Sequence, residues 1–248
     1  MTAVFKKDGI YLSLVIPAYN EENRIAESLK RTLGFLEAQP YTFEVVIVDD
    51  GSQDRTMDVV KEQFGRNSQV EIEHQARNLG KGEAVKRGML RGNGKYLFFS
   101  DADLSVPIET LSLFLSNLEA GFDITIASRK GMGALIEVHQ PIYREFMGKV
   151  FTELSTRILG LPVSDFTCGF KGFRREVAKD LFSRQRLKDW SFDAEILYLA
   201  SLKGYRVREI PVVWRDDRAT KVRLWRDVIT SFLGLLKIRL NDCLRRYR

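Results

Sequence analysis

The sequence predicts an α/β fold: a mostly parallel β-sheet with helices on both faces. In the first half of the chain, short β-branched and aromatic runs alternate with segments whose apolar residues recur at helical spacing. Runs such as VVIV at 45–48 are apolar without interruption, which is typical of strands buried on both faces. Strands that alternate with helices in this way indicate a parallel sheet.

The strands of the first half are expected in chain order, each followed by a polar or helical segment. Between the first two strands, the helix is indicated by Ile25, Leu29, Leu33 and Leu36, which recur every three or four residues. The predicted strands are 12–17, 43–50, 70–74, 95–101 and 123–128.

The second half of the chain is less regular. A helix over 193–203 ends before Gly204, a common residue at a helix C-terminus. The other expected elements are a helix over 143–159, a strand or extended loop over 166–173, a strand over 205–214 and a final helix over about 224–247. Because no low-complexity linker or repeat appears, we expect one domain over 1–222 and a C-terminal amphipathic helix over 223–248.

Composition narrows the classes of partner. The chain of 248 residues carries 39 Lys and Arg against 33 Asp and Glu, a net charge of +6, which favours nucleotide phosphates, nucleic acid or an acidic membrane surface. No nucleic-acid recognition motif appears, so a nucleic-acid partner is not expected. Two cysteines without metal or disulfide spacing indicate a reducing compartment. The longest uncharged apolar stretch, 228–236, is far below the ~20 residues of a spanning helix, so we expect no integral membrane protein.

Four polar clusters follow the first four predicted strands. They are PAYNEE (17–22), DDGSQD (49–54), NLGKGEA (78–84) and DAD (101–103). Ligands of parallel α/β sheets bind beyond the carboxyl ends of the strands, so these clusters are expected to meet in one crevice.

Each cluster has a functional and a structural interpretation. Asp101 and Asp103 repel each other unless a cation such as Mg²⁺ or Mn²⁺ binds them against a substrate diphosphate; alternatively they cap a turn and a helix. Asp49 and Asp50 suit hydrogen bonds from a base or ribose, or the start of a helix. The glycines around Lys81 suit a phosphate-binding turn, or a loosened turn with a solvated lysine.

The motifs together resemble the family 2 glycosyltransferases of the GT-A fold. More narrowly, they are similar to polyprenyl-phosphate and dolichyl-phosphate hexose synthases, especially the dolichyl-phosphate glucosyltransferase branch. Seven motifs appear in the family order over about residues 12–240: VIPAYNEE, VDDGSQD, NLGKGEAV, DADLSVP, DFTCGFKGF, WSFDAEILYLA and EIPVVWRDDRATKV. Each is weak alone, but the ordered series is specific.

The resemblance implies a role for individual residues. The nucleotide-sugar site would comprise Pro17, Ala18, Tyr19 and Glu21 around the base and ribose, Asp49 and Asp50 on the base and sugar, Lys81, and the Asp101, Ala102 and Asp103 element, whose aspartates bind Mg²⁺ or Mn²⁺. The acceptor phosphate would meet Ser128, Arg129, Arg144 and Arg218, while Lys221, after Thr220 in place of the usual serine, lies near the diphosphate. Residues 131–141 correspond to a variable acceptor loop.

The implied reaction is inverting transfer of a hexose, with glucose favoured, from a nucleotide sugar, with UDP-glucose favoured, to polyprenyl or dolichyl phosphate. Because the acceptor phosphate is already anionic, no strong general base is required; alignment and stabilisation of the leaving diphosphate dominate. The residues expected to carry catalysis are Asp103, Arg129, Arg144 and Lys221. Asp193 and Glu195 lie two apart on one helix and cannot both face the same point.

The final helix would contact the lipid. Trp225, Val228, Ile229, Phe232, Leu236, Leu240 and Cys243 share a predicted stripe, with a basic cluster at Arg245, Arg246 and Arg248. This pattern fits an interfacial helix on anionic lipid, although a core-packing helix has the same periodicity. We therefore expect a cytoplasmic protein, peripheral on the cytosolic face of a membrane.

Alternative functions stay open at this stage. GDP-mannose could replace UDP-glucose, the acceptor could be a soluble glycan, or the chain could be a nucleotide-binding protein without catalysis. The residues make no prediction of oligomeric state.

Overall fold

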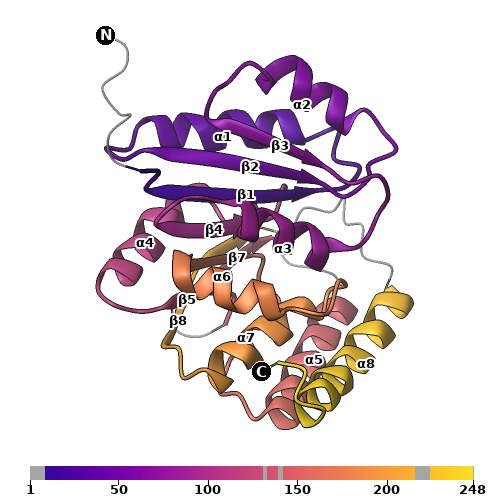
Figure 1. Ribbon diagram of the computed structural model, residues 1–248. Helices are drawn as coiled ribbons and strands as arrows, with labels where there is room; N and C mark the ends of the chain where they lie inside the picture. The colour runs from indigo at the N-terminus through magenta and orange to yellow at the C-terminus, as the bar shows by residue number, and fades with distance from the viewer. Residues whose placement is uncertain (1–8, 131–132, 139–141, 216–223, 248) are drawn as a thin grey trace.

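A seven-stranded β-sheet lies between two layers of helices (Figure 1). The computed structural model describes residues 9–130, 133–138, 142–215 and 224–247. The sheet order is β3-β2-β1-β4-β7-β5-β8. The strands are β1 (Leu12–Ala18), β2 (Phe43–Asp49), β3 (Val70–His74), β4 (Tyr96–Ser100), β5 (Ile124–Ser128), β7 (Phe170–Arg174) and β8 (Val207–Pro211). All neighbours pair in parallel except β7, which is antiparallel to β4 and β5.

Helices cover both faces of the sheet because alternate residues of each buried strand point to opposite sides. In β1, Leu14 and Ile16 join one core cluster and Val15 joins the other. One face carries α1 (Ile25–Glu37), α2 (Thr56–Phe64), the short 3₁₀ helix η1 (Ile108–Thr110) and α4 (Leu111–Glu119). The other carries α3 (Lys81–Arg91), α6 (Arg175–Arg184) and α7 (Phe192–Leu202). The predicted α/β class with a mostly parallel sheet is thus confirmed.

Individual predictions in the second half of the chain need correction. Segment 166–173 becomes a strand only from Phe170, and it enters the sheet antiparallel. The single strand predicted over 205–214 is wrong: β8 ends at Pro211, and β9 (Val213–Arg215) pairs with β6 (Leu135–Val138) in a second, two-stranded sheet. Helix α6 was not predicted, although its Val177, Ala178, Leu181 and Phe182 form a buried helical face.

The two longest helices lie side by side at one end of the molecule (Figure 1). They are α5 (Ile142–Leu159) and α8 (Leu224–Cys243), and the rings of Phe151 and Phe232 pack edge to face with centroids 6.0 Å apart. Helix α8 ends at Cys243, four residues before the predicted end at 247. None of the helices in the described ranges is long and apolar enough to cross a membrane.

The stripe predicted on α8 covers one of two apolar faces, and the side chains of its members Trp225, Val228 and Ile229 lie outside the described part of the chain. Leu235 and Ile238 are fully buried, and Phe232 packs beside them, whereas Leu236 and Leu240 are 57% and 56% exposed. Gly234 packs closely on Ser191, the residue before α7: a Cβ at Gly234 would lie 2.0 Å from the Ser191 hydroxyl.

Candidate active site

The loops after β1 and β2 are joined by side-chain to backbone hydrogen bonds. Asn20 adopts a left-handed backbone with φ of 55°, donates its N–H to the Ser52 hydroxyl at 2.9 Å, and accepts the Gln53 N–H at 2.7 Å. Glu21 donates its N–H to Thr56 Oγ1 at 2.6 Å, while its carboxylate pairs with Arg24. The hydrogen-bonded loop is preceded directly by Pro17, Ala18 and Tyr19, of which Ala18 is buried. The first two predicted clusters therefore do converge.

Asp49 and Asp50 are buried, and the protein itself occupies their carboxylates. Asp49 Oδ2 lies 2.6 Å from His74 Nδ1. Asp50 accepts the N–H groups of Leu79 at 2.7 Å and Gly80 at 2.9 Å. Burial raises the pKa of Asp50, and these two N–H donors oppose that shift. The pair therefore ties β2 to the loop before α3.

The glycine-rich turn before α3 had two open interpretations, a phosphate-binding turn or a loosened turn, and its N–H groups have partners within the protein. The N–H groups of Leu79 and Gly80 donate to Asp50, and that of Gly82 donates to the Lys188 carbonyl at 2.8 Å. Gly80 has a φ of 105°, and a Cβ there would lie 2.4 Å from the same carbonyl. The turn instead positions the side chain of Lys81, the first residue of α3.

Lys81, which belongs to the third cluster, contacts the fourth. Its Nζ lies 2.5 Å from Asp101 Oδ1 and 4.9 Å from the centroid of the Trp190 ring. Burial lowers the pKa of Lys81, but the nearby charges of Asp101 and Asp193 outweigh burial, so its pKa is raised and the ammonium stays charged. The clusters after β3 and β4 thus meet through an ion pair.

The Asp101, Ala102 and Asp103 element lies at the carboxyl end of β4. Asp101 donates its N–H to the Gly169 carbonyl at 3.1 Å, and a Cβ at Gly169 would lie 1.9 Å from Asp101 Oδ2. Asp103 accepts the Ser105 N–H at 2.9 Å, and Ala102 is buried between the two aspartates. Burial raises the pKa of Asp103, and the neighbouring Asp101 charge adds to the shift.

These two aspartates fit a divalent cation such as Mg²⁺ or Mn²⁺. The charge on Asp101 disfavours that on Asp103, and Lys81 already provides Asp101 with a cation. Within the described ranges, no group of three or more His, Cys, Asp or Glu side chains could hold a metal ion. Two carboxylates are the donor set that Mg²⁺ commonly takes from a protein when water and phosphate oxygens complete its shell.

Arg129 follows β5 and is held by Asp165, which the sequence analysis did not select. Asp165 accepts Arg129 Nε at 2.7 Å, Nη2 at 2.8 Å and the Arg129 backbone N–H at 3.0 Å. Thr167 accepts Nη2 at 2.9 Å, and the guanidinium lies 5.5 Å from the Trp214 ring centroid. Although burial opposes it, the Arg129 charge lowers the pKa of Asp165 to about 2, so the carboxylate stays ionised.

The segment 165–169 contacts both halves of the site. At one end, Asp165 and Thr167 hold Arg129; at the other, Gly169 contacts Asp101. Ser128, predicted at the acceptor phosphate, is instead buried, and its hydroxyl hydrogen-bonds to the Lys130 carbonyl and to Ser164. The signal that could have selected Asp165 is its place as the first residue of the DFTCGFKGF motif at 165–173.

Asp193 and Glu195 face different parts of the molecule. Asp193 is 2% exposed, pairs with the fully buried Lys171, and lies near Lys81. Glu195 is fully buried and accepts the Tyr247 hydroxyl at 2.6 Å and the Leu187 N–H at 2.8 Å. Asp193 therefore belongs to the charge network of the site, while Glu195 has a structural role through its hydrogen bonds to Tyr247 and Leu187.

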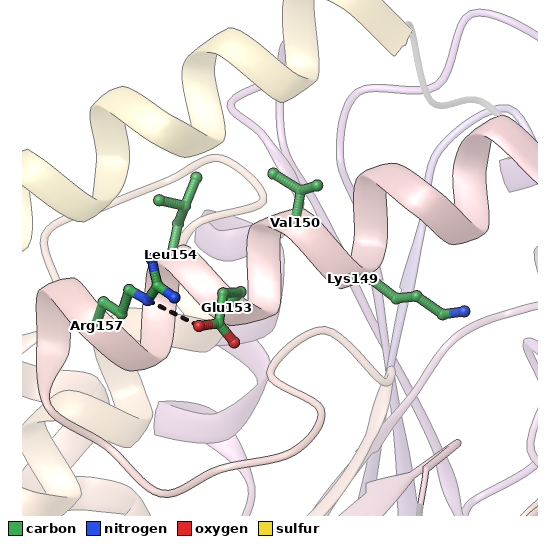
Figure 2. Close-up of a pocket in the computed structure, with 5 residues that line it drawn as sticks. All are labelled: Lys149, Val150, Glu153, Leu154 and Arg157. Atoms are coloured by element: carbon green, nitrogen blue, oxygen red, sulfur yellow. Dashed lines mark ion pairs between the residues drawn. The ribbon is translucent and has the colours of Figure 1, made fainter.

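Other predicted residues fall outside the described part of the chain. Arg218, Thr220 and Lys221 lie in 216–223, and Arg144 lies in α5 with an undescribed side chain. A separate shallow hollow on α5 is lined by Lys149, Val150, Glu153, Leu154 and Arg157. Figure 2 shows Val150 and Leu154 pointing toward α8, and Arg157 Nε pairs with Glu153 at 2.7 Å. None of the predicted site residues lines this hollow.

Comparisons with known proteins show the family of this chain. The profile of glycosyl transferase family 2 matches residues 13–182, which is more than half of the chain. The chain belongs to glycosyltransferase family 2. This glycosyltransferase is 34% identical over 249 residues to a dolichyl-phosphate beta-glucosyltransferase from Trichomonas vaginalis, covering 95% of the chain and 75% of that relative. A dolichyl-phosphate beta-glucosyltransferase from Saccharomyces cerevisiae is 35% identical over 260 residues, covering 97% and 78%.

A solved glycosyltransferase structure has a similar fold. The crystal structure of glucosyl-3-phosphoglycerate synthase from Mycobacterium tuberculosis, in complex with Mn²⁺, UDP and glucosyl-3-phosphoglycerate, matches with a TM-score of 0.68. Sequence identity is 19%, and the match covers 92% of this chain and 80% of that one. The GT-A fold and the family resemblance predicted from the motifs are thereby confirmed.

Proposed function

We propose that this glycosyltransferase moves glucose from UDP-glucose to dolichyl phosphate and forms a β-linked product. The relatives named dolichyl-phosphate beta-glucosyltransferase support the acceptor and the sugar. The UDP and Mn²⁺ in the complex of the M. tuberculosis synthase support the nucleotide and a divalent cation. The structural observation that carries the proposal is segment 165–169, which joins Arg129 on one side to Asp101 on the other.

The donor half of the proposed site lies at the ends of β1, β2 and β4. Asp101 and Asp103 would hold Mg²⁺ or Mn²⁺, which supplies positive charge to the leaving diphosphate. Pro17, Ala18, Tyr19 and Glu21 are proposed to surround the base and ribose. Because the carboxylates of Asp49 and Asp50 are bonded to His74 and to the loop before α3, we propose that they shape the nucleotide pocket through these loops.

The acceptor half is centred on Arg129. Its Nε and Nη2 are occupied by Asp165 and Thr167, so Nη1 is the group we assign to the phosphate. A guanidinium fixed before the substrate arrives loses little side-chain entropy on binding it. The ionised phosphate oxygen then attacks the anomeric carbon opposite the diphosphate, which inverts an α-linked donor to a β-linked product. Arg144, Arg218 and Lys221 are proposed to add positive charge here, and Ser128 to position the chain before Arg129.

The exposed face of α8 is the proposed membrane contact. Leu233, Leu236, Leu240 and Leu244 are 50% to 57% exposed and recur at helical spacing. Lys237, Arg239, Arg245 and Arg246 are exposed beside them and suit anionic lipid. With free thiols at Cys168 and Cys243, we propose the cytosolic face of the membrane. We keep 1–222 as the proposed catalytic domain and 223–248 as the proposed membrane-associated segment.

An assay with parallel donors and acceptors tests the function. The intact chain is incubated with Mg²⁺ or Mn²⁺, dolichyl phosphate and either UDP-glucose or GDP-mannose, and lipid-extracted product is measured. We expect glucolipid from UDP-glucose only. A soluble phosphate acceptor, 3-phosphoglycerate, serves as the control and is expected to give no product. Transfer from GDP-mannose alone, or to the soluble acceptor alone, contradicts the proposal.

A further inference from the structure

The salt bridge between Lys81 and Asp101 puts a cation of the protein on a proposed metal ligand. The Nζ to Oδ1 distance is 2.5 Å, and the two side chains are only 12% and 33% exposed. The charges of Asp193 and Asp103, like that of Asp101, raise the pKa of Lys81. Lys81 thus pairs with one carboxylate and is influenced by the charges of two more, and this negative charge would also attract a divalent cation.

The Lys81 side chain is held in this place from several directions. Trp190 contacts the ammonium with its ring, and the backbone on either side is fixed by the contacts of Gly80 and Gly82 with Lys188. Asp101 in turn fits against Gly169, because any residue with a Cβ at position 169 would leave no room for the Asp101 carboxylate. The ion pair is therefore part of the built site and not a loose surface contact.

A divalent cation at Asp101 meets two obstacles while Lys81 is there. The carboxylate oxygen is shared with the ammonium, and the two positive charges repel each other at short range. A nucleotide diphosphate changes both, because it offers the ammonium a second anion of higher charge. We propose that Lys81 is a counter-ion that weakens divalent-cation binding by the donor-free site, and that the arriving diphosphate draws Lys81 away from Asp101.

This inference rests on the proposed donor site and assigns Lys81 a positioning role there. Its consequence is coupled binding: the cation and the nucleotide each raise the affinity of the other. The donor-free protein then carries little bound metal, and the metal site is completed when the diphosphate is present.

Mn²⁺ binding by the intact chain tests the inference without any turnover. Free Mn²⁺ is measured by electron paramagnetic resonance, with and without UDP, for the unchanged protein and for Lys81→Met, which replaces the ammonium by an uncharged, unbranched side chain. Without UDP we expect Lys81→Met to bind Mn²⁺ about tenfold more tightly, within the usual range of site coupling. With UDP the advantage should disappear, because methionine cannot contact the diphosphate. Lys81→Arg keeps the charge and should keep the weak affinity.

Two further variants control for charge and location. Lys188→Met removes the same charge from an exposed lysine that pairs with Glu83 at 3.5 Å, and it should leave Mn²⁺ affinity nearly unchanged. Asp101→Asn, added to Lys81→Met, should abolish the gain. Circular dichroism melting checks that each variant is folded.

The outcomes separate this inference from the proposed function. If Lys81→Met binds Mn²⁺ no better than the unchanged protein without UDP, while both bind it with UDP, the counter-ion role is refuted and the donor site stands. If neither protein binds Mn²⁺ even with UDP, both proposals fail.

Discussion

At the scale of single residues, Asp165 shows how a buried carboxylate can prepare an arginine for a phosphate. Three hydrogen bonds from Arg129 end on this one side chain, which is 1% exposed. Charge-assisted hydrogen bonds of this kind contribute about 1.5–3 kcal/mol each. Because Asp165 is expected to touch Arg129 and not the substrate, its effect on the reaction passes through the position of that guanidinium.

We expect Asp165→Asn to raise the KM for dolichyl phosphate by about 10-fold or more, since a single charge-assisted bond corresponds to a free energy of that size. The affinity for UDP should stay within about twofold, and steady-state kinetics with equilibrium UDP binding measure the two separately. Asp180→Asn is the matched control, because Asp180 holds Arg184 at 2.8 Å on α6, away from the site. An equal loss of UDP affinity and acceptor affinity would indicate a general structural defect instead.

The sequence could predict residues whose chemistry lies in a local pattern. Asp101 and Asp103 follow a strand directly, and Lys81 stands between two glycines, so each signal lies within a few residues. Asp165 was missed because its partner Arg129 is 36 residues away along the chain. The sequence left two interpretations of the turn before α3 open for a similar reason, since the acceptors of its N–H groups, Asp50 and Lys188, come from distant segments.

At the scale of secondary structure, helix α8 shows what periodicity can and cannot predict. Its amphipathic character was evident from the sequence, but it has apolar residues on two sides, so periodicity alone did not decide which side faces the core. In the structure Gly234 packs closely on Ser191, Leu235 and Ile238 lie in the core, and Leu236 and Leu240 are exposed. Periodicity also did not show that the strand predicted over 205–214 is interrupted at Val212, between β8 and β9, which enter different sheets.

The exposed face of α8 gives a prediction about membrane binding. Changing Leu236 and Leu240 together to Ser should reduce binding to vesicles that contain anionic phospholipid by about 10-fold or more, because each buried leucine contributes roughly 1.5–3 kcal/mol. Vesicle co-sedimentation measures the effect. Leu113→Ser on α4, at a leucine with a similar exposure of 51%, is the control and should not change binding. Unchanged binding by the α8 variant would rule out this face as the membrane contact.

At the scale of the whole molecule, the residues after α8 join the C-terminal helix to the body of the domain. Tyr247 is 4% exposed and bonds to Glu195 on α7, while Arg184 of α6 donates to the Tyr247 carbonyl at 3.0 Å. Arg186 also donates to the Arg246 carbonyl. Since α7 carries Asp193 of the site as well as Glu195, the proposed membrane helix and the charge network of the site share one rigid support.

Tyr247→Phe tests how much this junction stabilises the molecule. The change removes the hydroxyl that Glu195 accepts at 2.6 Å, and it leaves the ring in place, so the buried carboxylate loses a donor without creating a cavity. We expect a loss of about 1–3 kcal/mol in the free energy of unfolding. For a chain of this size, each kcal/mol corresponds to roughly 2–4 °C in Tm. Urea and thermal unfolding measure the change, with Tyr205→Phe as the control, because Tyr205 bonds to the partly exposed Asp180 at 3.1 Å and should lose less. If the two variants were equally stable, the Tyr247 bond would contribute no more than a surface contact.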